Sequence, residues 1–383
     1  MIYFDNAATS FPKPQNVQLA AADAVRVYGG NPGRSGHKIS MRVSERVFRV
    51  RQQAAQYFGA EPENVIFTLN CTMALNMAIK GVIGKTGHLI TSSLEHNSVI
   101  RPIDALSRQS DVTYSVAEVV EEDPEATVQN FQKRIRADTK AIVCTYASNV
   151  SGTVLPIREL GKLCQKKGLV FIVDAAQAAG VFPIRIGELG IHCLCAAAHK
   201  GLYATTGTGL LILQKGVELQ PLLEGGTGSN SLELSQPDFL PDRLESGTIN
   251  TVGVLSLGAG FDFLEQHPSI YPYEMALCGR VYNEMKKMPG ITLVAKSFRL
   301  QEKAPLVSFN FDGIGSAEAA AYLSDRGFAL RGGLHCAGLA HRSLGTVEQG
   351  AVRFSPSSFN NTRQVSAFLE EVKKIQKNGQ LRG

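Results

Sequence analysis

The chain has 383 residues, a formal net charge of +5 and 44% hydrophobic residues, which is typical of a globular protein with room for two or three domains. Its charges are dispersed except in a basic terminal stretch that a solvated helix explains, so we expect no nucleic-acid partner. No apolar run is long enough to cross a bilayer, and the first residues lack the basic segment of a signal peptide. We therefore expect a cytoplasmic protein without a membrane partner.

Short apolar strands alternate with helices through the first two-thirds of the chain, as in proteins built from parallel β/α/β units. Strands that are apolar on both faces indicate a sheet covered by helices. Ligands of such sheets bind at the carboxyl ends of the strands, where several polar residues occur in this chain. The expected strands cover 64–69, 88–92, 140–146, 169–176 and 209–214, and the expected helices cover 40–58, 72–82, 97–109, 125–136 and 156–167.

The pattern changes after about residue 250. We interpret this last part as a smaller α+β domain, 251–383, which follows a large α/β domain, 1–250. Residues 1–14 form an N-terminal arm that could pack on the small domain. The expected elements of the small domain are a long helical stretch over 252–288, a strand over 306–311, a helix over 316–326, a strand over 351–356 and a last helix over 362–377.

Asp174 closes the apolar strand of the segment VDAAQ, where an unpaired carboxylate would be costly. The protonated pyridine nitrogen of pyridoxal 5′-phosphate (PLP) would supply a cationic partner, and holding that proton makes the ring an electron sink. Gln177 follows three residues later and could reach the phenolic oxygen of such a ring. An aspartate that caps the next helix explains this motif equally well.

Lys200 follows a strand of small residues and precedes a loop rich in glycine and threonine, KGLYATTGTG. A lysine amine is a nucleophile only when it is deprotonated, which burial next to a cation favours. The backbone N–H groups of such a loop could help to hold a phosphate. An isolated lysine of this kind is usually a surface residue in a turn, but the strand that ends in Asp174 shortly before it favours a covalent PLP site.

Two further strand ends fit a phosphate and an aromatic ring. Asn70, Cys71 and Thr72 run directly into a helix, whose N-terminus offers free N–H groups and a positive dipole to a phosphate. Plain helix capping is the alternative. His96 lies between a strand end and a helix start, where an imidazole could stack on a cofactor and move protons near neutral pH, although a lone histidine is more often structural.

The seven cysteines form no C-x-x-C pair and show no metal-ligand spacing, so we expect no metal site. Cys144, Cys193 and Cys195 lie in apolar runs and are typical of small buried residues in a reducing compartment. Cys336 differs, because it lies in the glycine-rich segment RGGLHCAG. A reactive thiol needs exposure and an electropositive neighbourhood, which the nearby basic residues Arg331, His335 and His341 could help to provide.

Ten motifs occur in order along the chain: YFDNAAT at 3–9, GRSGHKIS at 33–40, NCTMALN at 70–76, LEHNS at 94–98, SNVSGT at 148–153, VDAAQA at 173–178, HKGLYATTGTG at 199–209, LESGTIN at 244–250, LRGGLHCAG at 330–338 and VRFSPSSFNNT at 352–362. The ordered set resembles the class V aminotransferases among the fold type I PLP enzymes. Within that group it is most similar to the group II (Suf-like) cysteine desulfurases. The resemblance implies a large α/β domain with a mainly parallel seven-stranded sheet and a smaller C-terminal α+β domain.

The resemblance also implies how the cofactor is bound. Lys200 would hold PLP as a Schiff base and shuttle protons. Asp174 would pair with the pyridine nitrogen, Gln177 with the phenolic oxygen, and His96 would stack on the ring. The family's sites lie at the interface of a homodimer, so the phosphate would be held by the backbone around Cys71, by Thr72 and His199, and by Thr248 of the neighbouring subunit.

For the substrate, the resemblance implies a grip on the α-carboxylate, for which an arginine fork is well suited. A cysteine at the place of Cys336 attacks the sulfur of the cofactor-bound substrate in the desulfurases and becomes a persulfide. The expected reaction is therefore L-cysteine to L-alanine, with the sulfur on Cys336 available to an acceptor protein. The substrate-binding residues would be Asn149, Arg353, Arg34, Arg331 and Ala7.

Two other activities stay open at this stage. A selenocysteine lyase would use the same site, and a class V epimerase or aminotransferase would leave Cys336 as an unreactive loop cysteine. A non-enzymatic scaffold would be expected to lack Lys200 or Asp174, and neither is absent. The lysine loop is one residue longer than the Suf-type pattern and has Ala204 and Thr205 in place of Gly–Pro. Such departures leave the substrate and the sulfur acceptor open.

Overall fold

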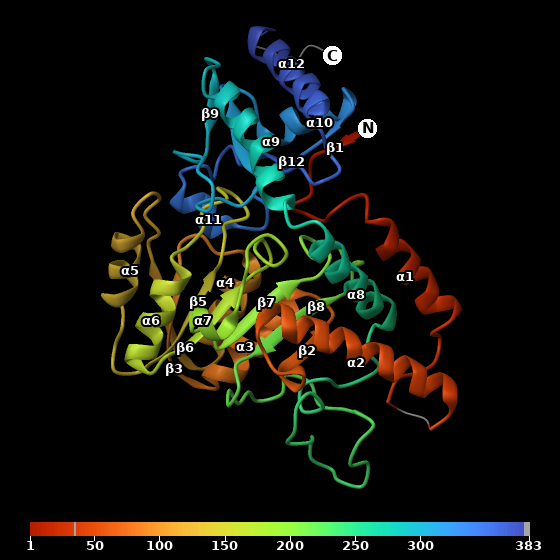
Figure 1. Cartoon of the computed structure of the whole chain (residues 1–383). Helices are drawn as coiled ribbons and strands as arrows, with labels where there is room; N and C mark the ends of the chain where they lie inside the picture. Colours follow the sequence, from red (N-terminus) through yellow and green to blue (C-terminus); the bar gives the residue numbers. More distant parts are fainter. Residues whose placement is uncertain (34–35, 379–383) are drawn as a thin grey trace.

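The computed structural model describes residues 1–33 and 36–378. A seven-stranded sheet lies in the middle of the molecule between layers of helices, and a smaller antiparallel sheet lies above it in Figure 1. In spatial order the large sheet consists of β2 (Val65–Thr68), β8 (Gly209–Leu213), β7 (Cys193–Ala197), β6 (Val170–Asp174), β5 (Thr139–Thr145), β3 (Thr86–Ser92) and β4 (Asp111–Ala117).

Most strands of the large sheet run in one direction. The strands from β7 to β4 pair in parallel, whereas β8 is antiparallel to both of its neighbours, β7 and β2. The expected mainly parallel seven-stranded sheet is therefore confirmed. The carboxyl ends of β2, β3, β5, β6 and β7 consequently meet at one edge of the sheet, which faces the small antiparallel sheet in Figure 1.

Successive side chains of a strand point to opposite faces of the sheet, and in this sheet both faces are apolar. In β6, Phe171 and Val173 belong to one hydrophobic core, and Ile172 between them belongs to another. The first core includes residues of α2, α6 and α8, and the second includes residues of α3 and α4. The helices before the small domain are α1 (Gln15–Arg26), α2 (Lys38–Phe58), α3 (Cys71–Ile83), α4 (Asn97–Gln109), α5 (Pro124–Gln132), α6 (Ile157–Lys167) and α7 (Ile186–Leu189), and α8 is Thr251–Gln266.

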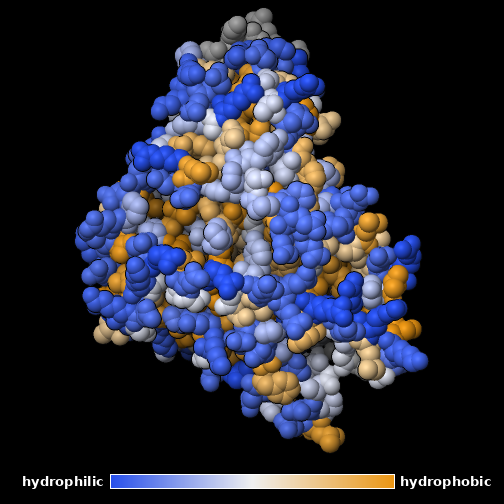
Figure 2. Space-filling view, in the orientation of Figure 1, coloured by the Kyte–Doolittle hydropathy of each residue, from blue (hydrophilic) through white to orange (hydrophobic). Residues whose placement is uncertain are grey.

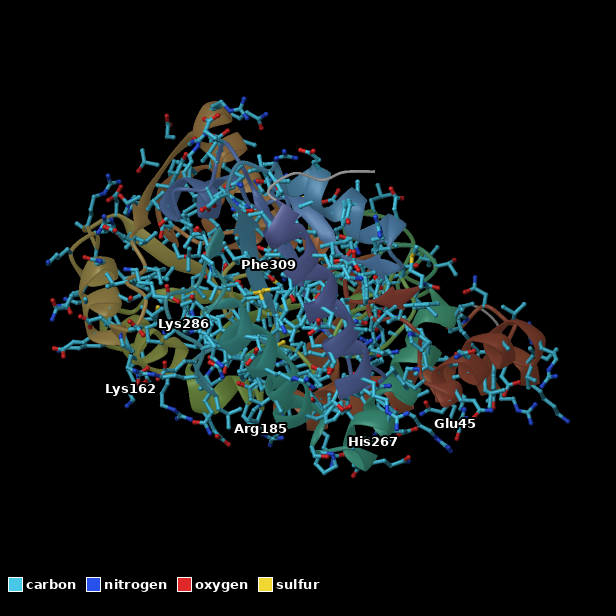
Figure 3. The ribbon with its side chains drawn as sticks, turned by 90° about the horizontal axis from the view of Figure 1, so that it is seen from above. Glu45, Lys162, Arg185, His267, Lys286 and Phe309 are labelled. Atoms are coloured by element: carbon cyan, nitrogen blue, oxygen red, sulfur yellow. The ribbon has the colours of Figure 1, made fainter. Side chains whose placement is uncertain are left out.

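The C-terminal part is built on a four-stranded antiparallel sheet, in the order β12 (Arg331–Gly333), β13 (Ala351–Phe354), β10 (Val307–Phe311) and β9 (Ile291–Leu293). Its helices are α9 (Ile270–Met285), α10 (Ser316–Asp325), α11 (Gly338–Ser343) and α12 (Thr362–Asn378). Phe309 lies close to α12 in the view from above (Figure 3), and its ring centre is 6.4 Å from that of Phe368. A separate aromatic core therefore holds this part together.

Two sequence-based expectations need correction. The stretch 252–288 is two helices, α8 and α9, because Pro268 has no N–H group to continue the first of them. The prediction also missed α1, the short strands β9 and β12, and β4, which lies at one edge of the large sheet. Its segment DVTYSVA is partly exposed because β4 pairs only with β3, so it lacks the continuous apolar run of the central strands. The domain boundary near residue 250 stays a prediction.

The N-terminal arm joins the C-terminal part of the fold. Strand β1 (Ile2–Tyr3) pairs in parallel with β11 (Phe328–Ala329), and Phe4 is buried in the aromatic core of the small sheet. Within the described ranges, no helix is long and apolar enough to cross a membrane.

Candidate active site

Residues from five strand ends enclose a cavity of about 160 Å³ at the carboxyl edge of the large sheet. The turn after each strand brings one or more polar side chains to this edge, as expected for ligand sites of α/β sheets. Asn70 lines the cavity as well, and so do Ser98 and Thr145, for which the sequence indicated no role. The lining residues that the sequence had singled out are Cys71, Thr72, His96, Asn149, Asp174, Gln177, His199 and Lys200.

Lys200 lies three residues after the end of β7 and is partly buried. Burial and the positive charge of Arg353 lower the pKa of its amine, an effect that the carboxylate of Asp174 opposes. The chain turns immediately after it, because the N–H group of Tyr203 donates a hydrogen bond of 2.9 Å to the Lys200 carbonyl. A lysine amine that loses its proton easily can act as a nucleophile and as a base.

Asp174 ends β6 and is buried. Its Oδ1 atom accepts hydrogen bonds from the N–H group of Ala176 (2.9 Å) and from Cys71 Sγ (3.4 Å). Burial and the nearby Asp174 raise the pKa of the Cys71 thiol well above its usual range, so it stays protonated and donates. Cys71 thus contacts the carboxylate through its side chain, a contact that the sequence analysis did not predict.

His199 precedes the lysine, and burial lowers the pKa of its imidazole to about 4, with repulsion from Lys200 and Lys13 in the same direction. The ring is therefore neutral at physiological pH. Its Nδ1 atom is buried and has no hydrogen-bond partner among the described residues. Because a buried polar atom without a partner is costly, an acceptor or donor from a bound ligand would fit this position.

His96 caps the start of α4. Its Nδ1 atom accepts a hydrogen bond of 3.1 Å from the N–H group of Ser98, so the proton of the neutral ring belongs on Nε2. Burial lowers the pKa of this ring, which favours the neutral form. The hydroxyl oxygens of Ser98 and Thr72 lie 2.7 Å apart. Ser98 belongs to the motif LEHNS. The sequence alone does not predict that its hydroxyl group pairs with that of Thr72, because the two residues lie at the starts of different helices.

Asn70 caps α3 and lines the same cavity. Its side-chain oxygen accepts a hydrogen bond of 2.9 Å from the N–H group of Met73. Cys71 and Thr72 are the first residues of the helix and line the cavity, so the N-terminal end of α3 borders it. The N-terminus of a helix as long as α3 can stabilise a phosphate through its free N–H groups and through the helix dipole.

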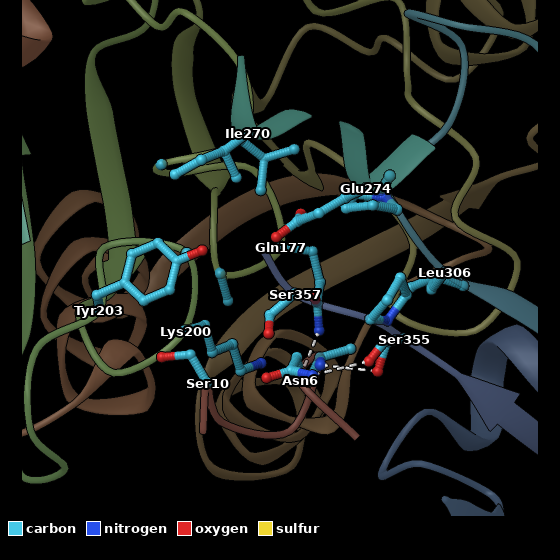
Figure 4. Close-up of a pocket in the computed structure, with 18 residues that line it drawn as sticks. Asn6, Ser10, Gln177, Lys200, Tyr203, Ile270, Glu274, Leu306, Ser355 and Ser357 are labelled. Atoms are coloured by element: carbon cyan, nitrogen blue, oxygen red, sulfur yellow. Dashed lines mark hydrogen bonds between the residues drawn. The ribbon is translucent and has the colours of Figure 1, made fainter. Parts of the chain in front are cut away.

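Gln177 lies between this cavity and a second one of about 50 Å³, which Lys200 and Ala7 also line (Figure 4). Its amide nitrogen donates a hydrogen bond of 2.9 Å to the carbonyl of Ala7. The side chain therefore connects the N-terminal arm to the segment that follows β6. The contact of Gln177 with the phenolic oxygen of the cofactor stays a prediction.

Glu274, in α9, also lines the second cavity (Figure 4). Burial raises the pKa of its carboxyl group to about 8, although hydrogen bonds from Ser358 and Tyr203 favour the ionised form. The folded protein therefore holds a proton here that the unfolded chain releases above its ordinary pKa of 4.5. The stability from this protonation is complete below that pH and is lost as the pH rises to about 8.

We expect Glu274→Gln to remove this pH dependence, because glutamine is neutral at every pH and keeps an acceptor oxygen. In urea unfolding, the free energy of unfolding of the variant relative to the parent should increase from pH 5 to pH 8. The control is Glu265→Gln, at an exposed position in α8, which should show no such trend. A constant difference between Glu274→Gln and the parent across this range would contradict the raised pKa.

Arg353, in β13, is buried beside the site. Its guanidinium group forms an ion pair of 2.9 Å with Asp5 and donates a hydrogen bond of 3.0 Å to the carbonyl of Asn149. Its Nε atom is buried without a hydrogen-bond partner among the described residues. The sequence alone does not predict the pairing of Arg353 with Asp5, because the two residues are 348 positions apart.

The side chain of Asn149 is directed to the loop of Cys336, since its Nδ2 atom donates a hydrogen bond of 2.8 Å to the carbonyl of His335. His335 and Cys336 both have left-handed backbone conformations, with φ angles of 50° and 54°. The N–H group of Asn97 donates a hydrogen bond of 2.7 Å to the carbonyl of Cys336. Such conformations are unusual outside glycine and occur often at functional sites.

Cys336 is the exposed one among the seven cysteines, and the other six are buried. Arg331 lies beside it, with a guanidinium nitrogen 3.6 Å from Sγ. The expectation that His335 and His341 contribute positive charge beside Cys336 is wrong. Burial lowers the pKa of both rings, that of His335 to about 3, so they stack as neutral rings with centres 5.8 Å apart.

Among the described residues that the sequence predicted for the site, those that do not line the first cavity are Ala7, Thr248, Arg331, Cys336 and Arg353, and Ala7 lines the second cavity. Thr248 lies in the exposed loop before α8 and lines a separate small cavity with Leu69 and Leu223. Arg34 lies outside the described residues. Within the described ranges, no group of three or more His, Cys, Asp or Glu residues lies close enough together to hold a metal ion.

The family model for class-V aminotransferases matches residues 2–368. Among curated proteins, the probable cysteine desulfurase of Pyrococcus abyssi is 29% identical and that of Methanothermobacter thermautotrophicus 26% identical. Each match covers 98% of this chain and 94% of the relative.

Solved structures match over the same range. The apo structure of the cysteine desulfurase from Thermococcus onnurineus NA1 superposes with a TM-score of 0.92 at 29% identity, covering 98% of this chain and 95% of that one. The cysteine desulfurase CsdA from Escherichia coli superposes with a TM-score of 0.85 at 25% identity, covering 98% and 94% of the two chains.

Proposed function

This chain belongs to the class-V aminotransferase family, whose members depend on PLP, and from that premise we propose that it is a PLP-dependent cysteine desulfurase. It would convert L-cysteine to L-alanine and retain the sulfur on Cys336 as a persulfide. The observation that carries this proposal is the position of Cys336. It is the exposed cysteine, it lies beside Arg331, and the side chain of Asn149 holds its loop against the candidate active site.

The residues around the cavity fit the cofactor. His199 presents a buried Nδ1 atom without a protein partner, and the first turn of α3 borders the same space. The carboxylate of Asp174 is buried at the cavity and would hold the proton of the pyridine nitrogen. We therefore propose that Thr72, His199 and the backbone at Cys71 hold the phosphate and that His96 stacks on the ring.

When bound, PLP withdraws electrons from the α-carbon of an attached amino acid. Lys200 would form the covalent link in the resting enzyme and, once released, remove the α-proton, for which its lowered amine pKa suits it. Arg353 would bind the substrate carboxylate with its unpaired Nε atom and Asn149 would contribute beside it, with Ala7, Arg34 and Arg331 lining the pocket. The positions of Ala7, Asn149, Arg331 and Arg353 support their proposed roles, whereas the role of Arg34, which lies outside the described residues, rests on the family resemblance alone.

The sulfur step consumes only the substrate and the thiol of Cys336. The thiolate of Cys336 forms an S–S bond to the substrate sulfur while the carbon–sulfur bond breaks, and the carbon then takes up a proton. Cysteine and one thiol thus become alanine and one persulfide, which balances without an external oxidant. Because the thiol is exposed, a sulfur-acceptor protein could reach the persulfide.

Alanine release from L-cysteine and from L-selenocysteine, followed in parallel, tests the proposed function. Comparable or faster release from cysteine, with a persulfide on Cys336, supports the desulfurase. Release from selenocysteine alone would favour a selenocysteine lyase, and release from neither would favour a class V epimerase or aminotransferase.

We also propose that the protein is a homodimer. The loop after β8 projects from the bottom of the molecule in Figure 1, and hydrophobic residues are exposed at that end in Figure 2. Leu232 and Leu234 are fully exposed in the single chain, and Leu223 is 54% exposed beside Thr248. Apolar side chains gathered in one exposed loop are typical of a surface that another protein covers. A second copy would bring its Thr248 to the cofactor phosphate.

Leu223→Asp is expected to shift the protein from dimer to monomer and to weaken PLP retention, because it places a charge in this surface. Sedimentation velocity and the absorbance of bound PLP after dialysis measure the two effects. The matched control is Leu300→Asp, because Leu300 is also 54% exposed but lies in the C-terminal part of the fold. A parent protein that is monomeric and still retains PLP would contradict the proposed dimer.

A further inference from the structure

One backbone carbonyl next to Lys200 receives an unusual set of hydrogen bonds. The carbonyl oxygen of His199 accepts from Thr9 Oγ1 (3.1 Å), from the N–H group and Oγ of Ser10 (3.2 Å each) and from Lys13 Nζ (2.7 Å). A carbonyl oxygen has two lone pairs, so four donors within this range more than saturate it. The shortest bond of the set comes from the one charged donor.

Lys13 is held in this position from two sides. Its ammonium group also donates a hydrogen bond of 2.7 Å to Ser10 Oγ, and its own carbonyl accepts one of 2.7 Å from Gln18 in α1. Burial lowers the pKa of Lys13 to about 8. Partial burial of a charged group costs free energy, and its hydrogen bonds to His199 and Ser10 offset that cost.

The residues just before this group pair with the segment that directly follows β13. Ser355 exchanges backbone hydrogen bonds with Phe4 (2.8 Å) and Asn6 (3.1 Å), and Asp5 pairs with Arg353. The arm therefore connects the strand that carries Arg353 to the peptide that carries Lys200. Ser10, Asn6 and Lys200 line one cavity, as Figure 4 shows.

We propose that Lys13 is a positioning residue for Lys200. Its ammonium group fixes the peptide between His199 and Lys200, and so fixes the point from which the Lys200 side chain reaches the cofactor. This inference rests on the proposed PLP function. Lys13 does not contact the reacting atoms and acts only through the His199 carbonyl.

The test measures covalent attachment rather than turnover. Apoprotein is mixed with PLP, samples are reduced with borohydride over time, and mass spectrometry quantifies the modified Lys200 peptide. Attachment is the condensation of the Lys200 amine with the cofactor aldehyde, which releases water and changes no oxidation state. If the parent gives no adduct at Lys200, the proposed function itself fails, which separates that outcome from failure of the Lys13 role.

Lys13→Met should slow attachment about tenfold, the size expected from losing one charge-assisted hydrogen bond. Lys13→Arg, which keeps the charge, should restore most of the rate, and Lys215→Met, at an exposed lysine after β8, should match the parent. Thr9→Val removes a neutral donor to the same carbonyl and should slow attachment by about twofold to threefold. It also keeps the test decisive if Lys13→Met does not fold.

A folded Lys13→Met variant that attaches PLP at the parental rate would overturn the proposal, and so would equal slowing in Lys13→Met and Lys13→Arg. If Lys13→Met does not fold, a parental rate in Thr9→Val would overturn it. Circular dichroism of each apoprotein establishes that the variants being compared are folded.

Discussion

Lys200→Ala is expected to abolish the covalent link to PLP and to lower alanine release at least about 1000-fold, because one side chain supplies both the nucleophile and the base. The fold should persist, since no described hydrogen bond that holds the sheet together uses the Lys200 side chain. Absorption spectra, borohydride trapping and steady-state rates measure the effect.

The matched control for this variant is Lys215→Ala, which removes an exposed lysine and should retain both colour and activity. A borohydride-stable adduct on another lysine of Lys200→Ala, together with substantial activity, would show that the cofactor lysine is assigned wrongly. Lys13 is the residue to examine first in that case, because burial lowers its pKa to about 8.

Cys336→Ser is expected to retain the PLP link and to bind cysteine, yet to release alanine about 100-fold or more slowly than the parent, because a hydroxyl group is a poor nucleophile toward sulfur. The loss should be smaller with selenocysteine, because the weaker carbon–selenium bond needs less help from a nucleophile. Alanine release from both substrates measures the contrast.

Mass spectrometry of the parent incubated with cysteine should find one added sulfur on the peptide that contains Cys336. The other six cysteines serve as an internal control, because all are buried. Burial also raises the pKa of Cys71, Cys144 and Cys195 well above the usual range, so their thiolates should be scarce. Added sulfur on another cysteine, or a parental rate in Cys336→Ser, would remove the basis of the desulfurase proposal.

Local sequence patterns predicted the positions of most strands and of the polar residues that follow them. Asp174 and Lys200 could be found because each ends or follows an apolar strand, and the direction of parallel strands then requires their side chains to meet at one edge. The burial of Cys144, Cys193 and Cys195 also followed from composition, since apolar runs are buried, and Cys336 differed from them because it lies in a glycine-rich polar loop.

The tertiary structure alone decided which distant residues share hydrogen bonds. Asp5 pairs with Arg353, Asn149 holds the loop of Cys336, and Lys13 holds the carbonyl next to Lys200. The tertiary structure also determines the charge of His335, because burial lowers the pKa of its ring and keeps it neutral. Sequence patterns report the periodicity and burial of each segment, whereas these contacts and charges depend on how the N-terminal arm, the large sheet and the small sheet pack against one another in three dimensions.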